Sequence, residues 1–597
     1  MSSTSWRVSR ESPLLRCFAL YREMPWRFSL TALLFLVGNL SLVLQQWLIG
    51  RAVHDVERGV AVVRQQDGGL DYQVALGWLG LLACVALARG ILQYFAGISA
   101  LVIGQELLYL LRVRIMAQVQ RLDLAYHREH GVGGMVTRTT RDADKMRDAL
   151  VNFWRQVVET AIVIVAAVGM LCWYAPLLGL VPLLITAIGL GIFVLQTNHL
   201  VSLDRAVGDA YDNVNQNLSE GVAGVRVIKA FGLERARVRD FSAQVETFTQ
   251  NSYRALAYAS SRIPVPQMVV ALGHAWVLAY GAQLVGLERL NIGELVSAML
   301  LANTLVLRVE SVGRVMQIFA DARSSAARIW EILDARPRHE GGQSALPPGP
   351  LGFSLEDVYV EKAEGQRFVL ERVSLRVEPG EIVALVGNTG SGKSTLMNLL
   401  PRLADADAGS VKIGSDALGL RDVKQLADGD LRRRVHVVPQ ESFLFSDTLR
   451  ANLQMSRPGA SDEELHEALR LASADEVLER LEQGLDTRIG DRGITLSGGQ
   501  RQRICLARAF LSQASILGFD DATSALDAAT ERRILDNLRD FKRSQGRAVS
   551  VLIVSSKLST VLLADRVLVL IDGKLVAQGT HRELEQSSAD YRELMGI

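Results

Sequence analysis

Charge and cysteine are both scarce in this sequence. Asp, Glu, Lys and Arg make up 22% of the 597 residues, and the formal net charge of +1 gives no argument for a nucleic-acid partner. The four cysteines are scattered without the spacing of a metal or redox site, so we interpret them as buried or lipid-facing thiols. The first residues are polar and Arg-rich, and no cleavable signal peptide is expected there.

Apolar residues are abundant, at 49%, and they gather in long uncharged runs before residue 334. Such runs are long enough to cross a bilayer as helices. The run from Thr160 to Leu203 is too long for one crossing, and Pro176 inside it predicts the turn of an apolar hairpin. Six spans are therefore expected, on Phe28 to Gly50, Val74 to Gln105, the two arms of the hairpin, Ile263 to Leu287, and Gly293 to about Phe319.

The connections between the spans indicate their orientation. The segment from Leu111 to Leu150 is rich in Arg and Lys, whereas the turn at Pro176 carries no charge. Because basic loops stay in the cytosol, both termini are expected there. The few cysteines and the compact arrangement of the spans suggest a bacterial inner membrane. Two polar excursions continue as helices beyond the lipid and predict docking turns near Leu122 to Arg128 and Val207 to Asp212. Ordinary solvated loops are the alternative.

Several polar residues lie at membrane depth. Each could contact a substrate or join two helices, and the sequence leaves both roles open. They are Gln45, Gln46, Arg89, Gln93, His274 and Asn303, with Arg262, Arg308 and Glu310 nearer the cytosolic ends.

A linker rich in Pro and Gly, residues 335–350, separates the membrane half (1–334) from a second, soluble half (351–597). There a predicted strand, Glu381 to Val386, runs into G-x-x-x-x-G-K-S and then a helix, which is the setting of a phosphate-binding loop. Its glycines let backbone N–H groups curl around phosphates, its lysine adds a cation, and its serine offers a hydroxyl to Mg²⁺. The predicted ATP-binding residues are Gly387, Asn388, Thr389, Gly390, Ser391, Gly392, Lys393, Ser394 and Thr395.

Two further motifs follow the phosphate loop. A predicted strand from Ala514 to Phe519 ends in Asp520 and Asp521, and the first aspartate is placed to hold Mg²⁺. Between these motifs lies the pentapeptide Leu496 to Gln500, LSGGQ.

Taken together, these motifs resemble the ATP-binding cassette (ABC) transporters, in particular exporter half-transporters with six helices before the cassette. The resemblance implies a helical membrane domain joined to an α/β cassette, and two cassettes facing each other head to tail. ATP would lie between one phosphate loop and the partner's Ser497, Gly498, Gly499 and Gln500, whose small residues suit close approach to phosphate. It also implies that Gln440 reaches Mg²⁺ together with Ser394 and Asp520.

The sequence departs from this family at three positions. The residue after the Mg²⁺ aspartate is usually a glutamate that polarises the attacking water, and here it is the shorter Asp521. The switch histidine is replaced by Ser556, and the adenine-stacking aromatic by Lys362. Asp521 and Ser556 together predict a site that binds ATP and barely hydrolyses it.

The expected protein is thus the degenerate subunit of a heterodimeric exporter, whose intact signature completes the partner's active site. A homodimeric exporter that hydrolyses slowly with Asp521 is the alternative, and a nucleotide-gated channel or regulator is the second. The sequence does not indicate which substrate is exported. Membrane lipid is the expected partner that surrounds the helices.

Overall fold

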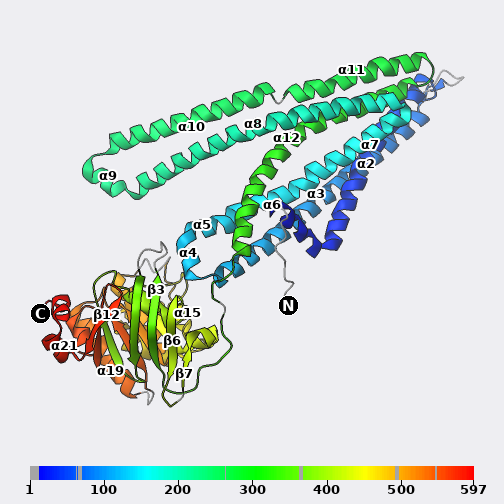
Figure 1. Cartoon of the computed structure of the whole chain (residues 1–597). Helices are drawn as coiled ribbons and strands as arrows, with labels where there is room; N and C mark the ends of the chain where they lie inside the picture. The colour runs from blue at the N-terminus through cyan, green and yellow to red at the C-terminus, as the bar shows by residue number, and fades with distance from the viewer. Residues whose placement is uncertain are drawn as a thin grey trace. The chain divides into compact units, whose positions relative to one another are not determined.

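The computed structural model describes residues 13–597 apart from 62, 65–69, 263, 340, 362–367, 418, 491–495 and 545–547. By its internal contacts the chain divides into two units. The first holds the described residues of Met1–Arg121 and His130–Arg336, and the second holds Leu122–Glu129 and Pro337–Ile597. The first unit is helical and the second is α/β, which is the predicted fold class (Figure 1).

Long helices build the first unit. They are α2 (Pro25–Glu57), α3 (Gln73–Arg121), α7 (Glu159–Tyr174), α8 (Pro176–Ala223), α10 (Glu234–Arg262), α11 (Pro264–Gly286) and α12 (Ile292–Asp334). Among the described residues, five continuous helical runs are long and apolar enough to cross a membrane, and they carry the first five predicted spans. The sixth predicted span lies on α12, which is not one of these five, so a count of six stays a prediction.

Short elements complete this unit. They are α1 (Pro13–Phe18), η1 (Ala19–Glu23), β1 (Val63–Arg64), β2 (Leu70–Asp71), α5 (Val132–Thr137), η2 (Arg138–Asp142), α6 (Ala143–Asn152), η3 (Phe153–Val158) and α9 (Val225–Phe231). Buried Asp142 accepts hydrogen bonds from Arg328 and Ser325 of α12, which fixes η2 against that helix.

The predicted hairpin turn is confirmed. Helix α7 ends at Tyr174, Ala175 is extended, and Pro176 begins α8 at its first position. A proline there costs no hydrogen bond and disfavours a helical residue before it, so the chain reverses at this point. The two arms pack tightly enough that a Cβ on Gly179 would lie 2.3 Å from the Cys172 sulfur.

The two predicted docking turns have different outcomes. Leu122 to Arg128 overlaps the short helix α4 (Leu124–His130), and Leu122–Glu129 is grouped with the second unit. The second prediction is wrong, since Val207 to Asp212 lies within the unbroken helix α8. Gly208 inside that segment stays helical, and the chain turns instead at α9, between Gly224 and Gly232, whose φ is +62°. Helix α10 returns from α9 alongside α8 (Figure 1).

The second unit contains two sheets. The antiparallel sheet has the order β4-β3-β6-β7, and the larger sheet has the order β12-β11-β5-β10-β9-β8. The strands are β3 (Gly352–Glu361), β4 (Phe368–Val377), β5 (Ile382–Val386), β6 (Ala408–Ser415), β7 (Gly419–Asp422), β8 (Val435–Val438), β9 (Ile516–Asp520), β10 (Ser550–Val554), β11 (Arg566–Ile571) and β12 (Lys574–Gly579).

Strands β5, β8, β9, β10 and β11 run parallel to one another, and β12 is antiparallel to β11. Every residue of β5, β9 and β10 is buried, because helices and the second sheet cover both faces of a parallel sheet. The helices are α13 (Lys393–Leu399), η4 (Val423–Gln425), α14 (Asp428–Arg434), α15 (Leu449–Gln454), α16 (Asp462–Leu471), α17 (Asp475–Glu479), η5 (Gly484–Asp486), α18 (Gly498–Leu511), α19 (Ala528–Ser544), α20 (Leu558–Val561), α21 (His581–Ser587) and α22 (Ala589–Met595). Because these parallel strands share one direction, the loops that follow β5, β8, β9 and β10 all lie at one edge of the sheet.

The predicted linker is irregular but attached to the second unit. Ser344 donates its backbone N–H to the Gln425 carbonyl at 3.0 Å and accepts from Ala427 at 2.8 Å. Leu346 is buried, and its N–H donates to Asp430 at 2.6 Å. The chain therefore joins the cassette before the first strand begins.

Candidate nucleotide site

The phosphate loop has the shape that its glycines predict. Strand β5 ends at Val386, and α13 begins at Lys393 with Gly392 as its N-cap at φ +100°. A Cβ on Gly392 would meet the Val369 carbonyl at 2.6 Å, and one on Gly387 would meet the Leu570 carbonyl at 2.1 Å. These positions leave no room for a side chain, so the backbone itself forms the cradle.

Lys393 curls back into this loop. Its ammonium donates to the carbonyls of Gly387 and Asn388, each at 2.7 Å. Burial lowers the pKa of Lys393, and the carboxylates of Asp520 and Asp521 oppose that shift. A cation held over backbone carbonyls in a glycine-lined cradle fits a phosphate of ATP, which would be a stronger acceptor than those carbonyls.

Asp520 ends β9, and Asp521 follows it at the same edge of the sheet. Asp520 is buried at 9% exposure. Asp521 takes a left-handed backbone, with φ +48°, and its N–H donates to the Val554 carbonyl of β10 at 3.1 Å. Burial raises the pKa of Asp521, the Lys557 ammonium lowers it, and the neighbouring Asp520 raises it.

Ser556 lies in the loop after β10 and is exposed. The functional group that this loop sends inward belongs instead to the next residue. Lys557 donates to the Thr523 carbonyl at 2.9 Å and to the Glu531 carboxylate at 3.0 Å. Glu531 is 2% exposed and also accepts from the hydroxyls of Thr523 and Thr560. This cluster ties the loop after β10 to the turn that follows Asp521.

Sequence reasoning missed Lys557 and Glu531. Lys557 stands directly after a position already singled out, so a cation beside Ser556 was the available signal. Glu531 is 10 residues beyond Asp521 on α19, and apolar Ile534, Leu535 and Leu538 follow it at helical spacing, so its place on the buried face was also an available signal.

The signature residues form the start of α18. Ser497 caps this helix, since its hydroxyl accepts from the Gln500 N–H and its own N–H donates to the Gln500 side chain. A Cβ on Gly499 would lie 2.9 Å from the Ala525 carbonyl. One turn later Gln502 bonds to Ser524 and Ala525, the turn that follows Asp521.

The predicted magnesium ligands come from three elements, with Ser394 on α13, Gln440 in the loop after β8 and Asp520 at the end of β9. Ser394 and Gln440 are exposed, and Gln440 follows β8 while Asp520 ends the adjacent strand β9. In the part of the chain that the structure describes, no group of three or more His, Cys, Asp or Glu could hold a metal ion by itself. A magnesium ion would therefore need the phosphates of ATP as ligands as well. Lys362, which stands where the family has its adenine-stacking aromatic, lies outside the described residues.

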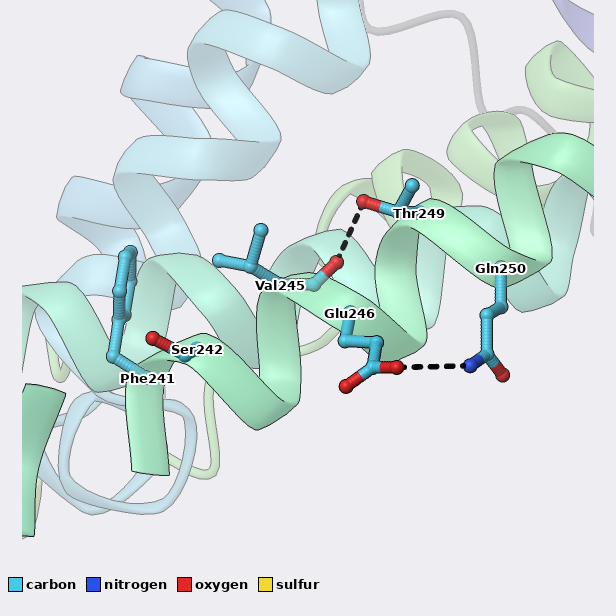
Figure 2. A pocket seen from close by; sticks show the side chains of 6 residues that line it. All are labelled: Phe241, Ser242, Val245, Glu246, Thr249 and Gln250. Atoms are coloured by element: carbon cyan, nitrogen blue, oxygen red, sulfur yellow. Dashed lines mark hydrogen bonds between the residues drawn. The ribbon is translucent and has the colours of Figure 1, made fainter. Parts of the chain in front are cut away.

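An open hollow on α10 is a separate feature (Figure 2). Its six lining residues come from this one helix: Phe241, Ser242, Val245, Glu246, Thr249 and Gln250. The Thr249 hydroxyl donates to the Val245 carbonyl and the Gln250 amide to Glu246, so these polar groups have partners within the helix. The hollow offers no chemistry of its own.

Comparison with known proteins supports this reading. The family model described as the ABC transporter transmembrane region matches residues 28–309, and the one described as ABC transporter matches residues 370–524. The chain is 30% identical to an ATP-dependent lipid A-core flippase of Desulfotalea psychrophila, over 87% of this chain and 89% of the relative. It is 29% identical to the multidrug resistance-like ATP-binding protein MdlA of Escherichia coli, over 96% and 95%.

Two further matches complete the comparison. The cyclolysin secretion/processing ATP-binding protein CyaB of Bordetella pertussis is 32% identical, over 88% of this chain and 72% of the relative. Among solved structures, a bacterial Atm1-family ABC exporter with ATP bound superposes with a TM-score of 0.81 and 24% identity, over 97% of this chain and 99% of that one. This last likeness shows the shared fold.

Proposed function

Because the chain belongs to the ABC transporters, we propose that it is the slowly hydrolysing subunit of a heterodimeric exporter. An ABC transmembrane region followed by an ABC ATPase domain makes it an ATP-driven translocase that is integral to the membrane. The proposal adds that its own ATP site is degenerate, and that its signature serves a different partner chain.

The observation that carries the proposal is the contrast within one site. The phosphate loop keeps its cradle and its lysine, whereas Asp521 and Ser556 stand where the family has glutamate and histidine. A carboxylate one methylene shorter than glutamate loses reach toward a water, and an exposed serine brings no positive charge to a phosphate. The signature, capped by Ser497, retains its full pattern.

Each group would then have a defined role at the paired sites. Lys393 and the loop N–H groups would hold the phosphates of an ATP that is seldom cleaved, with Mg²⁺ held by Ser394, Asp520 and Gln440. Ser497 to Gln500 would face the partner's phosphate loop and complete the site that turns over. The transported substrate crosses through the helices of both chains, in a bacterial inner membrane with both termini in the cytosol.

The homodimeric alternative has one observation in its favour. Burial raises the pKa of Asp521, and the Lys557 ammonium opposes that larger effect and so favours the ionised carboxylate. If that carboxylate reaches a water, two copies of this chain would hydrolyse ATP slowly.

The deciding experiment compares ATP turnover of this chain alone and paired with a second half-transporter. Asp521→Asn in this chain is expected to change turnover of the pair by less than about twofold, while Glu→Gln at the partner's equivalent position lowers it by about 10²–10⁴-fold. Lys393→Ala in this chain serves as the control for nucleotide occupancy. If this chain alone hydrolyses ATP and Asp521→Asn abolishes that turnover, the homodimer becomes the better account of the protein.

A further inference from the structure

The turn that ends α13 carries an arginine where glycine is usual. Helix α13 ends at Leu399, and Arg402 after it takes a left-handed backbone with φ +52°. The Arg402 N–H donates to the Leu399 carbonyl at 3.1 Å, and the next N–H, of Leu403, donates two turns back to the Asn398 carbonyl at 2.9 Å. These are the bonds of a Schellman motif, whose left-handed residue is most often glycine, since a Cβ is strained there. An arginine at this position therefore costs conformational energy that its side-chain contacts must offset.

The Arg402 side chain is buried against a carboxylate. Arg402 is 7% exposed, and its Nε and Nη2 donate to the two carboxylate oxygens of Asp405 at 3.0 and 3.2 Å. The Nδ1 of His339, in the linker, lies 2.7 Å from one of the same oxygens. The Asp405 side chain is 12% exposed, so this contact is largely shielded from solvent. Two basic side chains thus share Asp405, one from the turn after α13 and one from the linker.

The linker beyond His339 lies directly against the cassette. A Cβ on Gly342 would lie 2.7 Å from the Gln425 Cα, so the two backbones are in contact. Further along, the Arg421 guanidinium donates to the Ala345 carbonyl at 2.8 Å. The His339 contact therefore belongs to a segment that packs on the cassette at several points, unlike an isolated surface ion pair.

The chain between the helical unit and these contacts is short. Ala335, the residue after α12, accepts a hydrogen bond from Gln118 of α3 at 2.6 Å. The Arg338 N–H donates at 2.6 Å to Asp123, in the segment grouped with the cassette, and His339 follows directly. Only two residues lie between Ala335 and Arg338, and the chain between them spans about 10 Å when fully extended. A displacement of the end of α12 beyond that reach must therefore move the linker at His339.

We propose that the contact of His339 and Arg402 with Asp405 is a latch that couples the end of α12 to the phosphate loop. Arg402 holds the turn at the C-terminal end of α13, and the phosphate loop runs into the N-terminal end of the same helix. The seven residues of α13 make it about 10 Å long, so its two ends move as one rigid piece. His339 is thus a positioning residue, and by reciprocity a nucleotide at the phosphate loop also biases the end of α12.

A native thiol reports on the end of α12. Cys17 is fully buried, and its sulfur accepts a hydrogen bond from the Trp330 indole of α12 at 3.1 Å. Alkylation of Cys17 by N-ethylmaleimide therefore requires this contact to open. The full chain in maltoside micelles is treated with the reagent, with and without Mg²⁺ and adenylyl imidodiphosphate, and peptide mass spectrometry follows each cysteine separately. Exposed Cys84 is the control for the reagent itself.

The latch predicts which variants lose the response to nucleotide. In wild type, nucleotide is expected to change the alkylation rate of Cys17 at least about fivefold, the low end of the usual coupling between two sites. His339→Ala should remove most of this effect, and His339→Arg, which keeps a cation beside Asp405, should retain it. Four glycines inserted between Arg336 and Pro337 leave the latch intact but lengthen the chain before it, and they should also remove most of the effect.

His466→Ala is the matched control, since His466 is exposed on α16 and its Nδ1 lies 2.6 Å from the Asp462 carbonyl of its own helix. It should respond like wild type, and binding of a fluorescent ATP analogue should change less than about threefold in every variant. No response in wild type, or a full response in His339→Ala or in the glycine insertion, would overturn the latch. Should His339→Ala fail to fold or to bind nucleotide, the glycine insertion decides, because it removes no side chain.

The latch lies within one chain, so it is the same in a heterodimer and in a homodimer. ATP turnover that contradicts the proposed heterodimer leaves the latch standing. A Cys17 thiol that does not respond to nucleotide contradicts the latch alone.

Discussion

The two sides of the nucleotide site differ in what their side chains are able to do. On one side the phosphate loop places the Lys393 ammonium over its own carbonyls, in a cradle whose glycines admit no side chain. On the other side, Asp521 and an exposed Ser556 stand where the family has its hydrolytic glutamate and histidine. The cation of the loop after β10, Lys557, bonds inward to Glu531. Binding groups and hydrolytic groups are thus separable parts of the fold, and one can be lost while the other is kept.

The largest expected effect comes from restoring the hydrolytic side. Asp521→Glu combined with Ser556→His should raise ATP turnover of this chain's own site by about 10²–10⁴-fold, the usual contribution of a positioned base. Turnover is measured with the partner's own site inactivated by its Glu→Gln variant. If ATP turnover does not rise while ATP binding stays intact, residues other than these two also limit hydrolysis at this site.

Removing the binding side should have the next largest effect. Lys393→Ala is expected to weaken ATP binding by about 10–100-fold, because a charge-assisted hydrogen bond to phosphate is lost. Equilibrium binding of a fluorescent ATP analogue to the chain measures this. Lys574→Ala, which removes an exposed lysine paired with Glu371, should leave binding unchanged.

The Lys557–Glu531 pair is expected to stabilise the cassette and not to bind nucleotide. Lys557→Met leaves the buried Glu531 without its cation and should lower the thermal midpoint by several degrees, with ATP affinity changed less than about threefold. Glu531→Gln added to Lys557→Met should recover part of the loss, because no buried charge then remains unpaired. A large loss of ATP affinity would mean that Lys557 contacts nucleotide.

The smallest effect is a pH-dependent one. Burial raises the pKa of Asp521, so its ionised form costs folding free energy above that pKa. Asp521→Asn should therefore raise the thermal midpoint by a few degrees near pH 7, and the difference should vanish as the pH falls below about 4. An equal gain at both pH values would indicate a cause other than ionisation.

Much of the fold was predictable because it depends on local signals. Pro176 within an uncharged run predicts the hairpin turn, and the glycine spacing from Gly387 to Gly392 predicts the phosphate loop. The position of the second docking turn was missed, because a polar helical segment looks alike at Val207 to Asp212 and beyond. The break comes where Gly224 and Gly232 lie.

The predicted site residues are brought together by the sheet. Parallel strands β5, β8, β9 and β10 deliver the phosphate loop, Gln440, Asp520 with Asp521, and Ser556 to one edge. Each motif is readable by itself, but their proximity depends on a strand order that differs from the order along the chain. The loop after β10 turns Lys557 inward and not Ser556, because α19 contributes the buried partner Glu531.

The sequence by itself determined the class of protein, the spans that its uncharged runs allow, and the residue types available for ATP, because these follow from composition and short motifs. Only the tertiary structure decided which distant charges meet. Arg89, Glu159 and Arg308 are spread over about 220 residues, and only helix packing brings them together. Glu531 is tolerated among buried residues because three side chains from other segments of the cassette supply its hydrogen bonds, and only the tertiary structure brings those side chains together.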